Sequence, residues 1–302
     1  MKKSFLILFL LASFSIKAQD DTIKNIITEA TENSHLEILA HELLDIVGPR
    51  LTGTPQMRNA HDWAVQRYAD WGINAKIHEW GEWNGWERGI THIDMISPRV
   101  RTLSGIQLGY SPSTSLKGIT GELDVIPEVK NKDEFNAWLK TVKGKFILSS
   151  MYQITGRPDY NWEEYATPES FKKMKETRGE ATRKWNSNFR KMGINRRQIS
   201  KTLEDAGAIG LLSSNWAGGF GANRIFSTGT KTIPHLDLEL EDYSMLYRMV
   251  ESGAGPEIRV VSTSKDLGIV PTFNTLAEIK GVEKPDEYVI LSAHFDSWDG
   301  AT

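Results

Sequence analysis

Two residues near the end of the chain, His294 and Asp296, have the types and the spacing of one edge of a metal site. They follow an apolar, β-branched run, Tyr288–Ala293, which predicts a buried strand, and they precede a loop that contains Gly300. An imidazole binds a metal through one ring nitrogen, and a nearby carboxylate can hold the other ring N–H and orient the ring. One His and two Asp do not complete a catalytic site, and a structural His–Asp hydrogen bond fits the same pattern.

Other candidates for catalytic chemistry are weaker. The chain contains no cysteine, so any metal must be bound by His, Asp or Glu side chains. His41–Asp45 reads HELLD and lacks the second His of the H-E-x-x-H zinc helix, so a helix without metal fits it better. The sequence has no G-x-S-x-G, Walker A or G-x-G-x-x-G motif, which argues against a serine hydrolase and a nucleotide-binding protein.

Composition is that of an ordinary globular protein. The 302 residues are 39% hydrophobic and 25% charged, with a net charge of −3. This balance indicates neither nucleic acid nor a membrane surface as a partner, and it leaves the oligomeric state open. Without disulfides, an exported domain must depend on a large core, which this length permits.

The N-terminus has the features of a secretory signal peptide. Lys2 and Lys3 form a basic start, Ser4–Ile16 is a short apolar core, and Ala18 is the expected cleavage site. The apolar core is too short to span a membrane comfortably. We therefore expect residues 1–18 to be removed and the protein to be secreted or periplasmic.

The strongest local charge lies in Lys172–Lys201, which carries eleven Lys or Arg residues against two Glu. Such a stretch, with Trp185 and Phe189 interleaved, can contact a polyanion. A solvated helical face that balances an acidic remainder fits it better. Arg50, in a Gly- and Pro-containing loop, has two open roles: it lines a substrate pocket or forms a structural salt bridge.

Hydrophobic periodicity predicts the elements that position these residues. Helical spacing predicts two helices in Thr22–Leu44, broken near Asn33–Ser34, and another in Met57–Gly72. Strands are expected over Asn74–Trp86 and Trp86–Ser97. Further along, strands are predicted at Gly121–Ile126, Lys145–Ser149, Gly210–Ser213 and Glu257–Val261, a helical insertion at Pro168–Asp205, and a final strand pair at Asn274–Lys280 and Tyr288–Ala293.

Several of these segments resemble, in order, the co-catalytic di-zinc exopeptidases, in their carboxypeptidase Q-like (plasma glutamate carboxypeptidase-like) branch. Val47–Pro55 is similar to the early Gly-x-Arg-x-x-Gly loop of that family. Ala206–Leu212 and Ile233–Asp242 resemble parts of a protease-associated domain that is inserted in such enzymes. Asn274–Gly300 is the most specific match.

The resemblance implies a fold and a division into domains. The fold is α/β, a mixed sheet flanked by helices, interrupted by a β-rich protease-associated insert. After the signal peptide, residues 19–102 and 264–302 belong to the peptidase domain. Residues 103–263, called the inserted region below, form the insert, with a helical insertion at 168–205.

The resemblance also implies roles. His294 matches a zinc ligand, and Asp296 matches the catalytic carboxylate that orients it. Two zinc ions are expected in a complete site, with the bridging Asp, the general-base Glu and further ligands beyond residue 302. The function implied is an exported zinc exopeptidase acting on peptides or dipeptides, with this portion alone inactive. The alternative is a non-catalytic binding protein that keeps the fold.

Overall fold

The computed structural model describes residues 21–221 and 223–298, so the predicted signal peptide and Gly300 lie outside the described residues. The chain divides into two compact units, Met1–Gly48 and Pro49–Thr302. In the first unit, a helix over residues 21–32 is followed by α2 (Leu36–Ala40) and the π-helix η1 (His41–Val47). The predicted break is confirmed, and Ser34 Oγ accepts a hydrogen bond from the Leu36 N–H at 3.3 Å.

The second unit begins with a loop and the helix α3 (Pro55–Asp70). Thr54 caps the helix, because its Oγ1 accepts a hydrogen bond from the Met57 N–H at 3.2 Å, and Pro55 occupies the first turn, where its missing N–H costs nothing. The helix predicted at Met57–Gly72 is therefore confirmed, with its start two residues earlier. Its buried residues are Ala60, His61 and Ala64.

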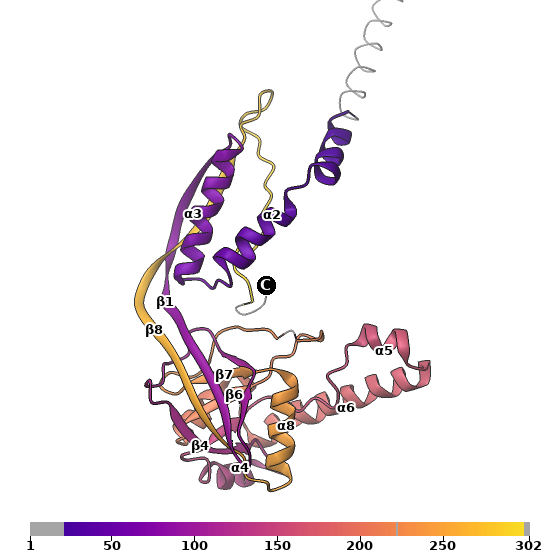
Figure 1. The fold of residues 1–302 in the computed structure, drawn as a ribbon, viewed down its shortest axis with the longest axis vertical. Helices are drawn as coiled ribbons and strands as arrows, with labels where there is room; N and C mark the ends of the chain where they lie inside the picture. Colours follow the sequence, from indigo (N-terminus) through magenta and orange to yellow (C-terminus); the bar gives the residue numbers. More distant parts are fainter. Residues whose placement is uncertain (1–20, 222, 299–302) are drawn as a thin grey trace, which may run out of the picture. The chain divides into compact units, whose positions relative to one another are not determined.

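A long antiparallel ribbon lies against α3. It consists of β1 (Asn74–Ser97) and β8 (Glu257–Glu278), paired from Asn74↔Glu278 to Ser97↔Glu257 (Figure 1). The two strands predicted over 74–97 are thus one strand, because its glycines form bulges instead of turns. At the bulge beside Gly85, a Cβ atom would lie 2.6 Å from Val270 Cγ1, so only glycine fits there.

The inserted region extends the sheet. The strand order is β2-β1-β8-β4-β5-β6-β7-β3, and the neighbours β4-β5-β6-β7 are parallel. The added strands are β3 (Gly105–Gln107), β4 (Ile119–Val125), β5 (Phe146–Leu148), β6 (Gly210–Ser213) and β7 (His235–Leu238), whereas β2 (Arg101–Leu103), at the boundary of the region, pairs with β1. The four strands predicted in this region are confirmed, and the fold is a mixed α/β sheet flanked by helices, as expected.

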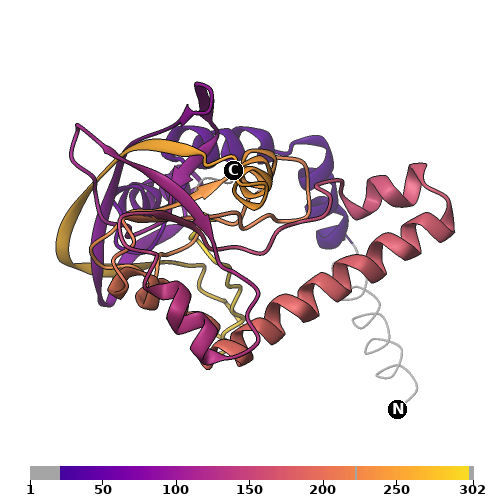
Figure 2. The same ribbon diagram turned by 90° about the horizontal axis from the view of Figure 1, so that it is seen from below.

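Helices cover both faces of this part of the sheet (Figure 2). The helices of this region are α4 (Lys132–Leu139), α5 (Asp159–Tyr165), α6 (Pro168–Met192), η2 (Arg196–Gln198), α7 (Ile199–Asp205) and α8 (Leu240–Glu251). Of these, α5 and the adjoining end of α6 project away from the sheet (Figure 1). On one face, Leu148 and Leu212 pack with Tyr243 of α8. On the other face, Ile147 and Leu211 pack with side chains of α4, α6 and α7. Successive side chains of these buried strands point to opposite faces of the sheet, so each strand contributes to both hydrophobic cores.

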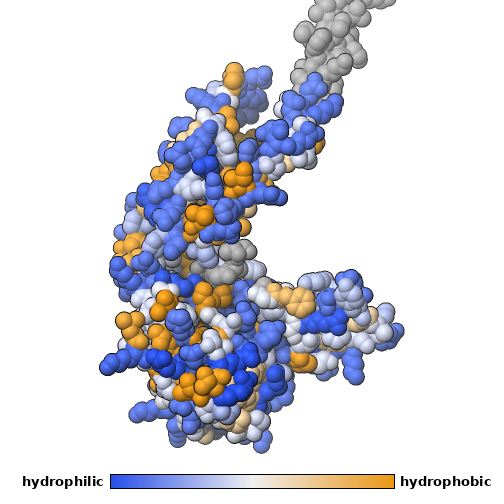
Figure 3. Space-filling view, viewed as in Figure 1, coloured by the Kyte–Doolittle hydropathy of each residue, from blue (hydrophilic) through white to orange (hydrophobic). Residues whose placement is uncertain are grey.

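The basic stretch forms most of α6, as the helical prediction required. Lys184 and Lys191 both pair with Glu128, and Arg178 pairs with Asp159 of α5. Most of the α5–α6 hairpin surface is hydrophilic (Figure 3). These acidic partners balance part of the positive charge of α6, and they belong to the inserted region itself.

The strand predicted at Tyr288–Ala293 is absent from the structure, and this prediction is wrong. Val289 and Leu291 are 96% and 95% exposed, and the segment forms no ladder with any described strand. The predicted partner, Asn274–Lys280, instead contributes residues up to Glu278 to β8, which pairs with β1. An apolar run needs a neighbouring strand to satisfy its backbone groups, and among the described residues no strand takes that place.

Candidate metal site

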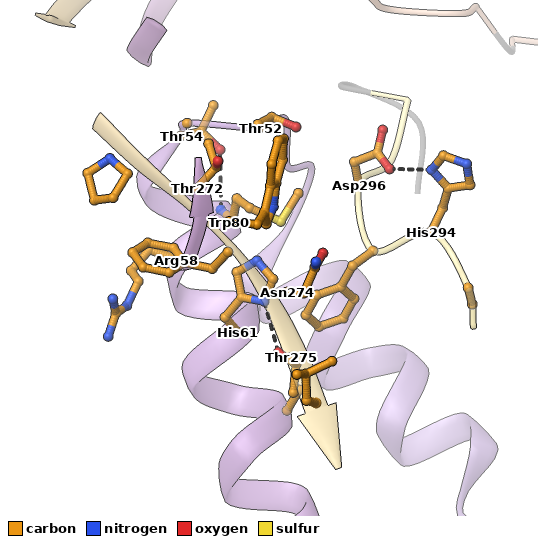
Figure 4. A pocket seen from close by; sticks show the side chains of 18 of the residues that line it. Thr52, Thr54, Arg58, His61, Trp80, Thr272, Asn274, Thr275, His294 and Asp296 are labelled. Carbon is orange, nitrogen blue, oxygen red and sulfur yellow. Dashed lines mark hydrogen bonds and ion pairs between the residues drawn. The ribbon is translucent and has the colours of Figure 1, made fainter. Parts of the chain in front are cut away.

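His294 and Asp296 form the pair that their spacing predicted. The His294 ring Nδ1 lies 2.8 Å from Asp296 Oδ1, and the His294 side chain is 94% exposed (Figure 4). When Nδ1 carries the proton and donates it to the carboxylate, Nε2 is left as the nitrogen with a free lone pair. Nε2 makes no hydrogen bond to a described residue. The pair therefore presents an oriented imidazole to solvent.

Arg50 holds the backbone on which this pair lies. Its Nε donates a hydrogen bond to the Phe295 carbonyl oxygen at 2.7 Å. Its N–H donates to Ser297 Oγ at 3.0 Å, and the Ser297 N–H donates to the Arg50 carbonyl oxygen at 3.0 Å. Three hydrogen bonds thus join positions 245 to 247 residues apart. These bonds give Arg50 a structural role at this segment.

Burial and charge act on Arg50 in opposite directions. Burial lowers the pKa of the guanidinium, and the negative charge of Asp296 raises that pKa in part. Arginine nevertheless stays protonated at any ordinary pH. Its positive charge therefore lies near the carboxylate of Asp296.

Aromatic packing supports the same segment from α3. The Phe295 ring lies 5.3 Å from the His61 ring and 6.5 Å from the Trp63 ring, measured between centroids. His61 Nδ1 lies 2.8 Å from Thr275 Oγ1 of β8. Burial, followed by the charge of Arg58, lowers the pKa of His61. His61 is therefore a buried, neutral side chain that packs against Phe295 and supports the segment.

A cavity of about 1240 Å³ lies between α3, β8 and the segment that ends in Asp296. Its walls are largely apolar, with Trp80, Phe273 and Ile290 among them. Arg58 also lines it but is engaged by Asp62 through two hydrogen bonds of 3.1 Å. His294 and Asp296 are also among the residues that line the cavity.

A second set of contacts holds the far end of the segment. The Trp298 ring lies 6.3 Å from the Phe226 ring, edge to face, and the Arg224 guanidinium lies 5.3 Å above the Trp298 ring. Arg224 and Phe226 belong to the inserted region. No sequence signal connects them to Trp298, because the contact joins residues more than seventy positions apart without a shared motif.

The described residues do not form a metal site by themselves. They contain no group of three or more His, Cys, Asp or Glu side chains placed to hold a metal ion. A catalytic zinc ion usually takes about three protein ligands. The donor chemistry of His294, with Nδ1 held and Nε2 exposed, fits one zinc ligand. The HELLD stretch does not, since His41 Nδ1 instead pairs with Asp45 Oδ2 at 2.7 Å on the helix surface.

Comparison with known proteins identifies the relatives of this chain. Carboxypeptidase Q of Pongo abelii is 26% identical over 288 residues, which is 94% of this chain and 54% of the relative. Carboxypeptidase Q of Homo sapiens is 27% identical over 258 residues, 85% of this chain and 48% of the relative. The chain is a homologue of carboxypeptidase Q. It spans about half the length of the carboxypeptidase Q sequences that it matches.

The fold agrees with that relationship to carboxypeptidase Q. The crystal structure of a peptidase M28 precursor from Shewanella amazonensis SB2B superposes with a TM-score of 0.61 at 20% identity. The match covers 94% of this chain and 59% of that one. No protein-family profile matches the chain. The fold of this chain is therefore similar to that of this crystal structure.

Proposed function

We propose that this protein is an exported zinc-dependent exopeptidase that hydrolyses peptides or dipeptides. The observation that carries the proposal is the homology to carboxypeptidase Q over 94% of the chain. The oriented pair of His294 and Asp296 supports it chemically, with Nδ1 and Oδ1 2.8 Å apart. The proposal rests on relatives about twice as long as the matched region, so it concerns the full-length protein.

In this proposal His294 binds zinc through Nε2. Asp296 accepts the Nδ1–H bond, which selects the tautomer and makes Nε2 a better ligand. Arg50 holds the intervening backbone through the Phe295 carbonyl group and so limits the positions that the imidazole can take. When bound, zinc polarises a scissile carbonyl group and lowers the pKa of a bound water molecule. We infer a site of two zinc ions, whose other ligands come from residues outside those described.

The proposal includes the domain organisation and the destination of the protein. Residues 19–102 and 264–302 contribute to a peptidase domain, and the inserted region is a protease-associated domain. Residues 1–18 are a signal peptide that is cleaved after Ala18, which makes the product secreted or periplasmic. Among the described residues, no helix is both long enough and apolar enough to cross a membrane.

A pair of matched variants tests the proposed ligand. In the full-length protein, His294→Ala should lose both zinc and dipeptide hydrolysis. Asp296→Asn should keep part of the zinc and lower activity about 10–100-fold, the usual effect of removing a group that orients a metal ligand. Elemental analysis and rates with a dipeptide provide the two measurements.

His41→Ala is the control for these variants, because His41 also forms an exposed His–carboxylate pair, with Asp45. It should leave zinc content and activity unchanged. Full zinc and full activity in His294→Ala would refute the ligand assignment. A wild-type protein that binds no zinc and cleaves no peptide would favour the non-catalytic binding protein.

A further inference from the structure

The inserted region holds one loop in place with a buried carboxylate. Asp237 of β7 is 1% exposed. It accepts hydrogen bonds from Ser213 Oγ at 2.7 Å, from the Asn215 N–H at 3.0 Å and from Asn223 Nδ2 at 2.7 Å. A buried carboxylate with several donors is costly to disturb. The two ends of the loop, Asn215 and Asn223, are therefore fixed to the sheet.

The residue that follows this loop is Arg224. Its N–H donates a hydrogen bond to the Asn215 carbonyl oxygen at 2.8 Å. Two residues later, the Phe226 carbonyl oxygen accepts a bond from the Gly109 N–H at 2.8 Å. The backbone on both sides of the Arg224 side chain is thus tied to the inserted region. The exposed side chain reaches the face of Trp298, with 5.3 Å from the guanidinium carbon to the ring centroid.

Trp298 lies two residues beyond Asp296, on the segment that Arg50 holds. Arg224 therefore brings a positive charge from the inserted region to the segment of the proposed zinc ligand. The other two arginines near that segment have named partners, since Arg50 bonds to Phe295 and Arg58 to Asp62. Arg224 forms no ion pair with any residue in the described ranges 21–221 and 223–298. Its hydrogen-bond donors remain available to a ligand.

We propose that Arg224 is a substrate-recognition residue that binds a free carboxylate of the peptide, and this rests on the proposed exopeptidase function. A guanidinium presents paired N–H donors that match the two oxygens of a carboxylate. The Trp298 ring, whose centroid lies 5.3 Å from the guanidinium carbon, limits the positions of the Arg224 side chain before substrate arrives, which reduces the entropy lost on binding. The proposal thereby assigns the recognition of a free terminal carboxylate to the inserted region.

Kinetics with a dipeptide and its C-terminal amide test this role in the full-length, zinc-loaded protein. Arg224→Gln should lower kcat/KM for the free dipeptide about 10–100-fold, mainly through KM, because one charge-assisted contact is lost. The rate with the amide should change less than about 3-fold. Arg224→Lys should restore part of the loss with the free dipeptide, since it keeps the charge but not the planar fork. Arg196→Gln, an exposed arginine of the same region, is the control and should change neither rate.

The variant Phe226→Ala distinguishes carboxylate recognition by Arg224 from positioning of the Trp298 ring. It removes a ring that packs on Trp298 but keeps the charge of Arg224, so it should affect both substrates equally. Equal losses on dipeptide and amide in Arg224→Gln would overturn the proposal, because Arg224 would then only position Trp298.

Binding provides a test that does not depend on turnover. A dipeptide analogue with a reduced, uncleavable peptide bond is titrated calorimetrically, as free acid and as amide. The wild-type protein should bind the acid at least about 10-fold more tightly, and Arg224→Gln should abolish that preference. A preference that survives in Arg224→Gln, or is absent from the wild type, overturns the proposal. If the preference depends on Arg224 but no peptide is cleaved, the exopeptidase function fails while the carboxylate site stands.

Discussion

Two segments of this chain that contain apolar runs have different structures. Strand β6, Gly210–Ser213, is buried at all four residues and pairs with β5 on one side and β7 on the other. Tyr288–Ala293 is equally apolar but unpaired, and Leu291 is 95% exposed. The difference lies in the neighbours of each segment. An apolar run predicts a strand reliably only when other strands satisfy both of its edges.

The largest expected effect comes from a substitution in β6, the buried segment of the two. In the 302-residue chain, Leu212→Ala should lower the free energy of unfolding by about 2–5 kcal/mol, because it leaves a cavity in a closed core. Leu291→Ala should change it by less than about 0.5 kcal/mol. Urea unfolding of both variants measures the contrast. A cost for Leu291→Ala near that of Leu212→Ala would mean that Tyr288–Ala293 is packed in solution.

A buried and an exposed histidine extend this comparison to the dependence of stability on pH. Burial lowers the pKa of His235 to about 4, and its Nε2 atom has no hydrogen-bond partner among the described residues, whereas His294 is exposed. Between pH 6.5 and 4 the unfolded chain binds a proton that the folded chain does not. Stability linked to His235 is therefore present above pH 6.5 and lost as the pH falls toward 4, by about 3 kcal/mol in total.

Urea unfolding from pH 7 to pH 4 tests the His235 prediction. The wild-type protein should lose more stability over this range than His235→Gln does. The exposed His92 provides the control, and His92→Gln should follow the wild-type curve. A wild-type curve that coincides with that of His235→Gln would show that His235 titrates normally in the folded protein.

The smallest effect should appear within the C-terminal segment itself. Arg50→Met removes the guanidinium that bonds to the Phe295 carbonyl oxygen but keeps a side chain of similar length. Hydrogen exchange at the Ser297 amide should become faster by roughly 10-fold, the equivalent of about 1.4 kcal/mol of local stability. Exchange in Tyr288–Ala293 should stay fast in both proteins. Unchanged protection of the Ser297 amide would show that the Arg50 side chain does not hold the segment.

Much of the local structure was predictable from sequence. The periodicity of apolar residues predicted α3, α6 and the strands of the inserted region. Each of these elements contains its own apolar pattern, with Gly or Pro residues marking the turns beside it. The prediction that two strands span 74–97 was wrong for a tertiary reason. The glycines of β1 sit opposite β8, where a bulge accommodates them, so they do not end the strand.

Sequence by itself determined the pairing of His294 with Asp296, since two residues along an extended chain bring the side chains within hydrogen-bond reach. It also determined the relationship to carboxypeptidase Q. Only the tertiary structure decided that Arg50 holds the segment through its backbone and that the Arg224 guanidinium lies over the Trp298 ring. It likewise decided that Tyr288–Ala293 has no strand partner among the described residues. The physical reason is distance along the chain: periodicity reports contacts within a few turns, whereas contacts between remote segments depend on how the whole sheet brings them together.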